Sequence, residues 1–171
     1  MIGFRRFGAL LLAALALFFS VTACASRPKS ETLPEPSADP ASAFPVKVTV
    51  PGQEPVTIPQ QPKHIVSLSP TATETLYEVG AGEEVVAVDQ YSNYPKQAPR
   101  TKLTGFTTDA GALGRYEPDL VILPDNATEL AEGLRAIDVP VLVTPAADSL
   151  DAAYEQIEAI GTATGHSAQA R

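Results

Sequence analysis

The sequence has few of the residues from which metal and redox sites are built. Its 171 residues include one cysteine, two histidines and no tryptophan. One cysteine cannot form a disulfide within the chain. His64 and His166 lie far apart in the sequence, one at the start of an expected strand and one at the start of an expected helix. A metal site needs more ligands than these residues provide, so we predict no metal site and surface positions for both histidines.

Motifs typical of enzymes are also missing. The sequence contains no GxSxG nucleophile elbow and no phosphate-binding loop. Gly80-Ala81-Gly82 is a GxG, but Val85 stands where a dinucleotide fingerprint has its third glycine, and the motif precedes a strand instead of following one. A small α/β enzyme or nucleotide-binding domain is therefore the weaker alternative, and we expect no catalysis and no resident cofactor.

Basic residues are scarce. Twelve lysines and arginines stand against 20 acidic residues, which gives a formal net charge of −8. A surface of this sign argues against nucleic acid as a partner and against adhesion to anionic lipid. It is compatible with a secreted module, which we expect to be a monomer.

The first 24 residues read as an export signal. Arg5 and Arg6 precede an apolar run at 8–19, which has the length of a signal-peptide core and is shorter than the ~20 residues of a membrane span. The following Val21-Thr22-Ala23-Cys24 resembles the bacterial lipoprotein signal, in which small residues precede an acylated cysteine. We predict a signal peptide at 1–23 and lipidation of Cys24. The alternative is an ordinary secretory leader with a chance cysteine.

The next stretch, 24–44, is rich in proline, serine and alanine. It cannot bury enough apolar surface to offset the entropy of ordering, so we predict a disordered tether between the bilayer and a folded lobe at 45–165.

Residues 62–94 predict a strand, a helix and a second strand. Ile65 to Leu68 is an apolar run of strand length, and 84–88 is a second one. Between them, Thr71 and Glu74 form an expected capping box beside Pro70. The helix has Leu76, Tyr77 and Val79 on its apolar side and stops at Gly80. Such a βαβ unit sends two loops to the same edge of one sheet.

The same pattern continues to the end of the chain and predicts a mostly parallel sheet of four or five strands in a three-layer α/β/α sandwich. The expected elements are a hairpin at 46–50 and 56–58, a short strand at 102–104, a helical turn or two at 109–116, a buried strand at 119–123, a helix that begins near 126, a strand at 141–143 and a helix at 148–163. The helix near 126 is opened by an Asn126/Glu129 capping box and has the apolar stripe Ala127, Leu130, Leu134 and Ile137. The last helix has Leu150, Tyr154, Ile157 and Ile160 on one face and Gly165 after it.

Loops that follow the strands supply the candidate ligand contacts, because ligands of open α/β sheets sit at the carboxyl edge. Tyrosines offer a flat apolar face with a polar tip, and a helix amino terminus offers free N–H groups. Thr71 as a mere cap, Asn126 as a helix cap and a tyrosine packed on the domain are the alternatives. The candidates are Ser69, Pro70 and Thr71 after the first strand, Asp89, Tyr91, Asn93 and Tyr94 after the second, and Phe106 further on.

Segment 46–171 resembles the amino-terminal lobe of the substrate-binding proteins of ABC importers that carry cobalamin, haem or iron-siderophores, the class whose two lobes are joined by one long helix. The matching sequence segments are PKHIVSLSPTATETLYEVGAG, VVAVDQYSNYP, the GF at 105–106 and YEPDLVIL. The YSNYP word is most similar to the cobalamin-binding branch, in which the counterpart of Tyr91 faces the corrin.

This resemblance implies capture without chemistry. The ligand would lie between two lobes and be delivered to a membrane permease driven by an ATPase, on the extracytoplasmic face of the membrane. The second lobe is not in the sequence, so we expect a fragment or a truncated product, with 166–171 beginning the joining helix. Two positions depart from the family: Pro124 replaces an expected aromatic residue, and Gly111 replaces the glutamate that pairs with a permease arginine. An anchored surface module without a small ligand is a further alternative.

Overall fold

The computed structural model describes residues 43–106 and 108–171. The predicted signal peptide, Cys24 and all but the end of the predicted tether lie outside the described residues. In the described part, no helix is both long and apolar enough to cross a membrane.

The described residues form an α/β lobe with one parallel sheet and one small antiparallel hairpin. The sheet has the strand order β4-β3-β5-β6, and the hairpin pairs β1 with β2. The elements are β1 Val46–Val48, β2 Val56–Ile58, β3 Ile65–Ser67, α1 Pro70–Glu78, the 3₁₀ turn η2 Gly82–Glu84, β4 Val85–Val88, α2 Ala110–Leu113, the 3₁₀ turn η3 Gly114–Tyr116, β5 Leu120–Leu123, α3 Thr128–Arg135, β6 Val141–Val143 and α4 Leu150–Thr164.

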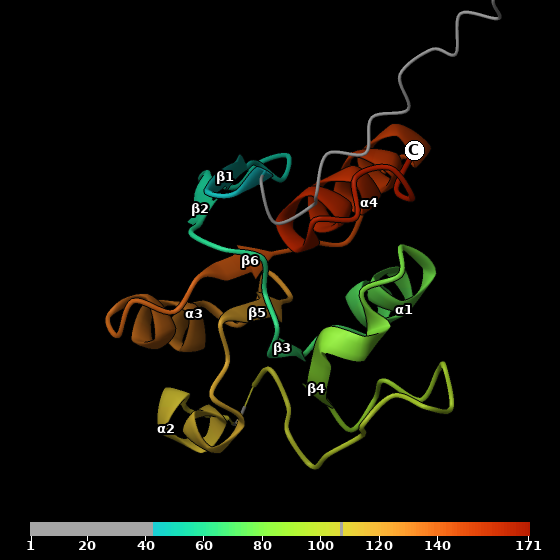
Figure 1. Cartoon of the computed structure of the whole chain (residues 1–171). Coiled ribbons are helices and arrows are strands. Elements are labelled where there is room, and N and C mark those ends of the chain that lie inside the picture. Colours follow the sequence, from blue (N-terminus) through green and yellow to red (C-terminus); the bar gives the residue numbers. More distant parts are fainter. Residues whose placement is uncertain (1–42, 107) are drawn as a thin grey trace, which may run out of the picture. The chain divides into compact units, whose positions relative to one another are not determined.

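Helices cover both faces of the sheet, as the predicted three-layer sandwich requires (Figure 1). Strand residues alternate between two cores. Ile65, Leu120 and Ile122 pack with α1, α4 and the hairpin, while Val66, Val121 and Leu123 pack with α2 and α3. The parallel strands therefore read as continuous apolar runs, because both faces are buried.

Three predicted features are confirmed by the local geometry. The hairpin forms at β1 and β2, and the predicted turns at 109–116 form as α2 and η3. Gly80 and Gly165 follow α1 and α4 with φ of 93° and 83°, so each ends its helix in the left-handed region that favours glycine.

Both predicted capping boxes are wrong. The N-cap of α1 is Ser69, whose side chain accepts from the Ala72 N–H, so Pro70 takes the first helical position and Thr71 the second. The N-cap of α3 is Ala127, without a side-chain cap. In the first case the proline sets where the helix begins.

The predicted strand at 102–104 is also wrong. A single parallel bridge joins Val88 to Arg100 instead. The neighbouring backbone still follows β4, since the Thr101 N–H donates to the Val88 oxygen at 3.0 Å and the Gln90 N–H donates to the Leu103 oxygen at 3.0 Å. The segment is therefore an irregular edge next to β4 that leads the chain toward Phe106.

Some residues that were predicted to lie in the core are exposed, and one histidine that was predicted at the surface has a buried ring nitrogen. Ile137, just beyond the end of α3, is exposed. Leu150 and Tyr154 are exposed too, because α4 turns Ala159, Ile160 and Ala163 to the sheet and the hairpin in place of its first turns. Ring atom Nε2 of His166 is buried without a hydrogen-bond partner among the described residues, whereas His64 is exposed as expected. Residues 167–170 form turns that follow α4.

Candidate functional site

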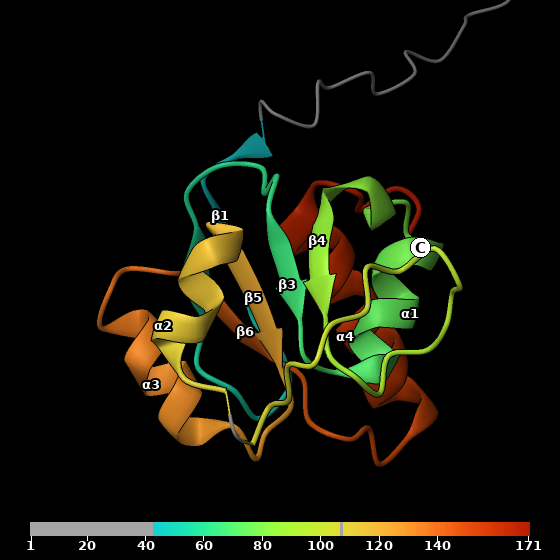
Figure 2. The same cartoon turned by 90° about the horizontal axis from the view of Figure 1, so that it is seen from below.

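The four parallel strands end at one rim of the sheet, and the predicted ligand contacts lie in the segments that follow β3 and β4 at this carboxyl rim: Ser69 before α1, Pro70 and Thr71 in its first turn, and the others in the loop after β4. Figure 2 shows the arrowheads of β3, β4 and β5 pointing to the same side of the lobe. The loops after β3, β4, β5 and β6 begin at Leu68, Asp89, Pro124 and Thr144.

The amino terminus of α1 occupies the middle of this rim. The Ser69 hydroxyl accepts from the Ala72 N–H at 3.4 Å, and Ser69 is 8% exposed. Pro70 and Thr71 are exposed in the first turn. The positive end of the helix dipole therefore opens onto the rim beside the Thr71 hydroxyl.

A pocket of about 350 Å³ lies between this helix terminus, α4 and the loops after β5 and β6. Ser69 and Thr71 line one side, and Thr144 and Gln156 line the other. Gln156 is held in place because its amide donates to the Pro145 oxygen at 2.9 Å. The pocket therefore combines hydroxyl and amide groups with a larger share of apolar residues.

The loop at 89–94 is anchored from beneath. Asp89 is 2% exposed, and its Oδ1 accepts from the Ser92 N–H at 2.8 Å. The Ser92 hydroxyl is 2.9 Å from the Thr73 hydroxyl of α1. The carboxylate that the sequence offered as a ligand contact thus closes the loop from the inside.

Three aromatic side chains in the loop between β4 and α2 are exposed. Tyr91, Tyr94 and Phe106 are 56%, 57% and 68% exposed. Asn93 lines a shallow depression beside Lys96 and Arg100. Exposed aromatic residues on the loop that leaves the carboxyl end of a parallel strand can offer flat apolar faces to a ligand.

Asn126 is the residue whose role the sequence prediction missed. It does not cap α3, and among the described residues its amide has no hydrogen-bond partner. Asn126 lines the pocket and also a second depression that contains Gly105 and Phe106. It therefore connects the two concave parts of the rim and can both donate and accept a hydrogen bond.

Thr144 and Gln156 were also not among the predicted site residues. Thr144 follows β6 directly, so the rule applied to the earlier strands would have found it. Gln156 lies in the second turn of α4, and its place in the pocket wall depends on packing that has no local sequence signal.

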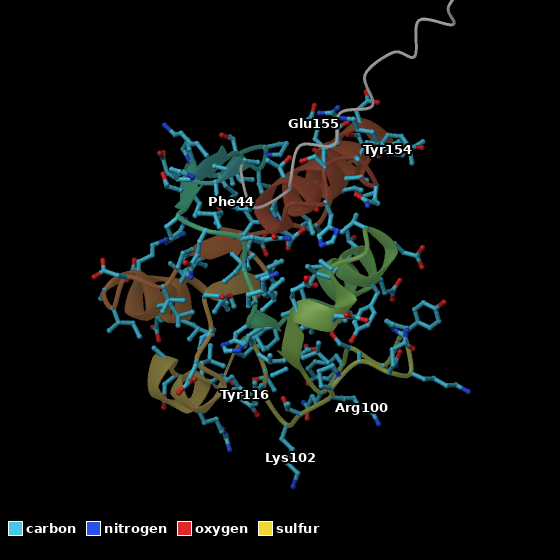
Figure 3. All side chains as sticks on the ribbon, in the orientation of Figure 1. Phe44, Arg100, Lys102, Tyr116, Tyr154 and Glu155 are labelled. Atoms are coloured by element: carbon cyan, nitrogen blue, oxygen red, sulfur yellow. The ribbon has the colours of Figure 1, made fainter. Side chains whose placement is uncertain are left out.

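The charge around the pocket is low. Among the described lining residues, Asp125 is the charged one, and there is no lysine, arginine or histidine. Arg100 and Lys102 extend from the side of the lobe opposite α4 (Figure 3). Burial raises the pKa of the Tyr77 phenol, which lies outside the pocket. No group of three potential metal ligands occurs in the part of the chain that the structure describes.

Comparison with known proteins gives relatives of one kind. The model of the family described as periplasmic binding protein matches residues 65–171. A cobalamin-binding protein of Halobacterium salinarum is 32% identical over 170 residues, covering 96% of this chain and 46% of the relative. An uncharacterized ABC transporter substrate-binding lipoprotein of Bacillus subtilis, YvrC, is 32% identical over 127 residues, covering 71% of this chain and 40% of the relative.

Solved structures agree with this comparison. The periplasmic heme-binding protein RhuT from Roseiflexus sp. RS-1 has a TM-score of 0.56 and 31% identity, covering 65% of this chain and 43% of the other. The chain thus spans less than half of the length of these relatives. The relatives are substrate-binding proteins and not enzymes, in agreement with the predicted class. The chain belongs to the periplasmic binding protein family.

Proposed function

We propose that this protein is the lipid-anchored substrate-binding protein of an ABC importer and that its carboxyl rim forms one wall of the ligand site. The observation that carries this proposal is a carboxyl rim with exposed aromatic residues on the loop after β4 and a pocket lined by hydroxyl and amide groups without a basic side chain. The ligand is held between this lobe and a second lobe, and the loaded protein delivers it to a membrane permease that a cytoplasmic ATPase drives. No covalent step is involved.

Cobalamin is the ligand that fits the rim best. A corrin ring has two flat faces for Tyr91, Tyr94 and Phe106, and its edge has neutral amide groups for Asn126 and the hydroxyls of the pocket. Haem has two propionates and ferric siderophores are commonly anionic. Such ligands favour arginine or lysine partners, and the described lining of the pocket has neither. The H. salinarum relative named for cobalamin binding supports the same choice.

Titration separates the three ligand classes. The purified 171-residue chain in detergent is titrated by calorimetry with cyanocobalamin, haem and a ferric catecholate siderophore. We expect saturable binding of cyanocobalamin and weaker or no binding of the other two. The affinity will be modest for a single lobe, because ligand pockets usually bury about 70–90% of a ligand's surface. Tighter binding of haem or siderophore would contradict the assigned ligand, and no binding of any of the three would contradict capture.

Membrane attachment is proposed through acylation of Cys24. Two or more acyl chains hold a protein stably on a bilayer, whereas one chain holds it weakly. In cells fed labelled palmitate, the wild-type protein should take up label and remain with the membrane fraction. A Cys24→Ala variant should do neither. Equal labelling of the two proteins would disprove the anchor.

We propose that this lobe docks to the permease through residues other than the one at the family's usual glutamate position. Gly111 occupies that position in α2. The nearby Asp109 is the N-cap of α2, because its Oδ1 accepts from the Ala112 N–H at 2.8 Å. Because the Asp109 carboxylate already accepts this backbone N–H, a permease group that binds it would share it with the helix terminus.

A further inference from the structure

Three buried hydroxyl groups and one buried carboxylate lie between α1 and the loop that holds Tyr91. Ser67 and Thr73 are 0% exposed, and Asp89 and Ser92 are 2% exposed. Burying polar groups destabilises a fold unless they are hydrogen-bonded, and each of these four residues has a partner among the others. The four residues are called the rim network below.

The hydrogen bonds of the rim network run in one direction. The Thr73 hydroxyl donates its single proton to Ser67 Oγ at 2.9 Å, and the Ser67 hydroxyl donates to the Ser69 carbonyl oxygen at 3.1 Å. The 2.9 Å contact between Ser92 Oγ and Thr73 Oγ1 therefore has Ser92 as its donor. A chain of hydroxyls ordered in this way strengthens each of its bonds.

The carboxylate closes the network on the loop side. Asp89 Oδ1 accepts from the Ser92 N–H at 2.8 Å, and the Asp89 N–H donates to the Ser67 carbonyl oxygen at 3.1 Å. Ser92 is thus held by both its backbone and its side chain. Its neighbours Tyr91 and Asn93 are exposed, so one buried anchor lies between two outward-facing candidate contacts.

We propose that the rim network is a positioning device for the ligand wall. It ties the loop at 89–94 to the end of β3 and to α1, and this fixes Tyr91 at the rim before a ligand arrives. Thr73 and Ser92 are positioning residues that act through Tyr91 and touch no ligand themselves. A pre-ordered wall saves the ordering cost of a free loop on binding. The role in affinity depends on the proposed function, while the ordering of the loop does not.

The absence of tryptophan from the chain allows a direct test. In the 171-residue chain that carries Tyr91→Trp, the introduced residue is the sole tryptophan, and acrylamide quenching of its fluorescence reports how tightly the loop is held. Thr73→Val removes the central hydroxyl, and Ser92→Ala removes the same bond from the loop side without changing α1. Thr73→Ser retains the hydroxyl. Thr164→Val is the matched control, because Thr164 is 2% exposed and its hydroxyl donates to the Ile160 oxygen at 2.9 Å within α4.

Greater quenching of the introduced indole in Thr73→Val and Ser92→Ala, with parental quenching in Thr73→Ser and Thr164→Val, would support the positioning role. Parental quenching in Ser92→Ala, or an equal increase in the Thr164→Val control, would overturn it. In protein with native Tyr91, Ser92→Ala should also raise the Kd for cyanocobalamin about two- to tenfold, the effect of one neutral hydrogen bond. If neither the wild type nor any variant binds cyanocobalamin, the proposed ligand fails and the quenching result still decides the role of the network.

Discussion

The two rims of the parallel sheet use their polar groups in different ways. At the amino rim, the Asp119 carboxylate accepts from the Lys63 N–H at 2.7 Å and from the His64 N–H at 2.9 Å. The His64 ring also lies 3.1 Å from the Glu117 carbonyl oxygen through Nδ1. At this rim the side chains at the surface join the beginnings of β3 and β5 directly.

At the carboxyl rim, the joining groups are buried and the surface is left for other partners. Asp89 and Ser92 lie beneath the loop, while Tyr91 and Tyr94 are more than half exposed above it. Large aromatic side chains that are more than half exposed are poorly explained by core packing alone. We therefore propose that the amino rim serves stability and the carboxyl rim serves recognition. Each of the following predictions changes one rim and measures both properties.

The largest effect is expected at the amino rim. Asp119→Ala removes the acceptor of two backbone N–H groups, so it should lower the free energy of unfolding by about 2 kcal/mol, the size expected for bonds to a charged acceptor. Urea unfolding followed by circular dichroism measures this change, and affinity for cyanocobalamin should stay at its wild-type value.

Asp125→Ala is the matched control at the carboxyl rim, because Asp125 is exposed and has no hydrogen-bond partner in the described part of the chain. It should change stability by less than ~0.5 kcal/mol. If both substitutions cost the same stability, the two rims do not differ in the way that their hydrogen bonds suggest.

A smaller effect, confined to binding, is expected at Tyr91. Tyr91→Ala should weaken cyanocobalamin affinity by about 1.5 kcal/mol, roughly a tenfold rise in Kd, through the loss of one aromatic wall. Stability should be unchanged, since the side chain is 56% exposed. Calorimetric titration gives the first value and urea unfolding the second.

Tyr154→Ala provides the control for Tyr91. Tyr154 is 61% exposed on α4 (Figure 3) and is not among the residues that line the pocket. An equal loss of affinity in the two variants would show that any exposed tyrosine has this effect and would remove Tyr91 from the site.

The fold and the location of the candidate site follow from local sequence, and the details depend on tertiary contacts. Runs such as 120–123 predicted buried parallel strands, and the carboxyl-edge rule then selected the rim. The cap of α1 was predictable too, because a proline at the first helical position makes the preceding Ser69 the N-cap. The bond between Thr73 and Ser92 joins two different elements, and no local pattern signals it.

Helix faces show the same limit. Spacing predicted Leu150 and Tyr154 in the core, yet both are exposed while Gln156 is buried. Periodicity identifies a helix, but the rotation of the helix about its own axis depends on the elements that pack against it. Here the hairpin and α1 select the small residues Ala159 and Ala163, which allow close packing.

The smallest effect is expected at Asn126, where the sequence predicted a helix cap and the side-chain amide has no hydrogen-bond partner among the described residues. Asn126→Ala should leave stability within ~0.5 kcal/mol of wild type, because no cap is lost. It should raise the Kd for cyanocobalamin about fivefold, the effect of one neutral hydrogen bond to an amide of the ligand. Asn126→Asp keeps the shape of the side chain but replaces its N–H donor with a negative charge. It should therefore weaken binding of the neutral ligand at least as much as Asn126→Ala does. A loss of stability of about 1 kcal/mol in Asn126→Ala, with unchanged affinity, would restore the capping role and place Asn126 with the groups that serve the fold.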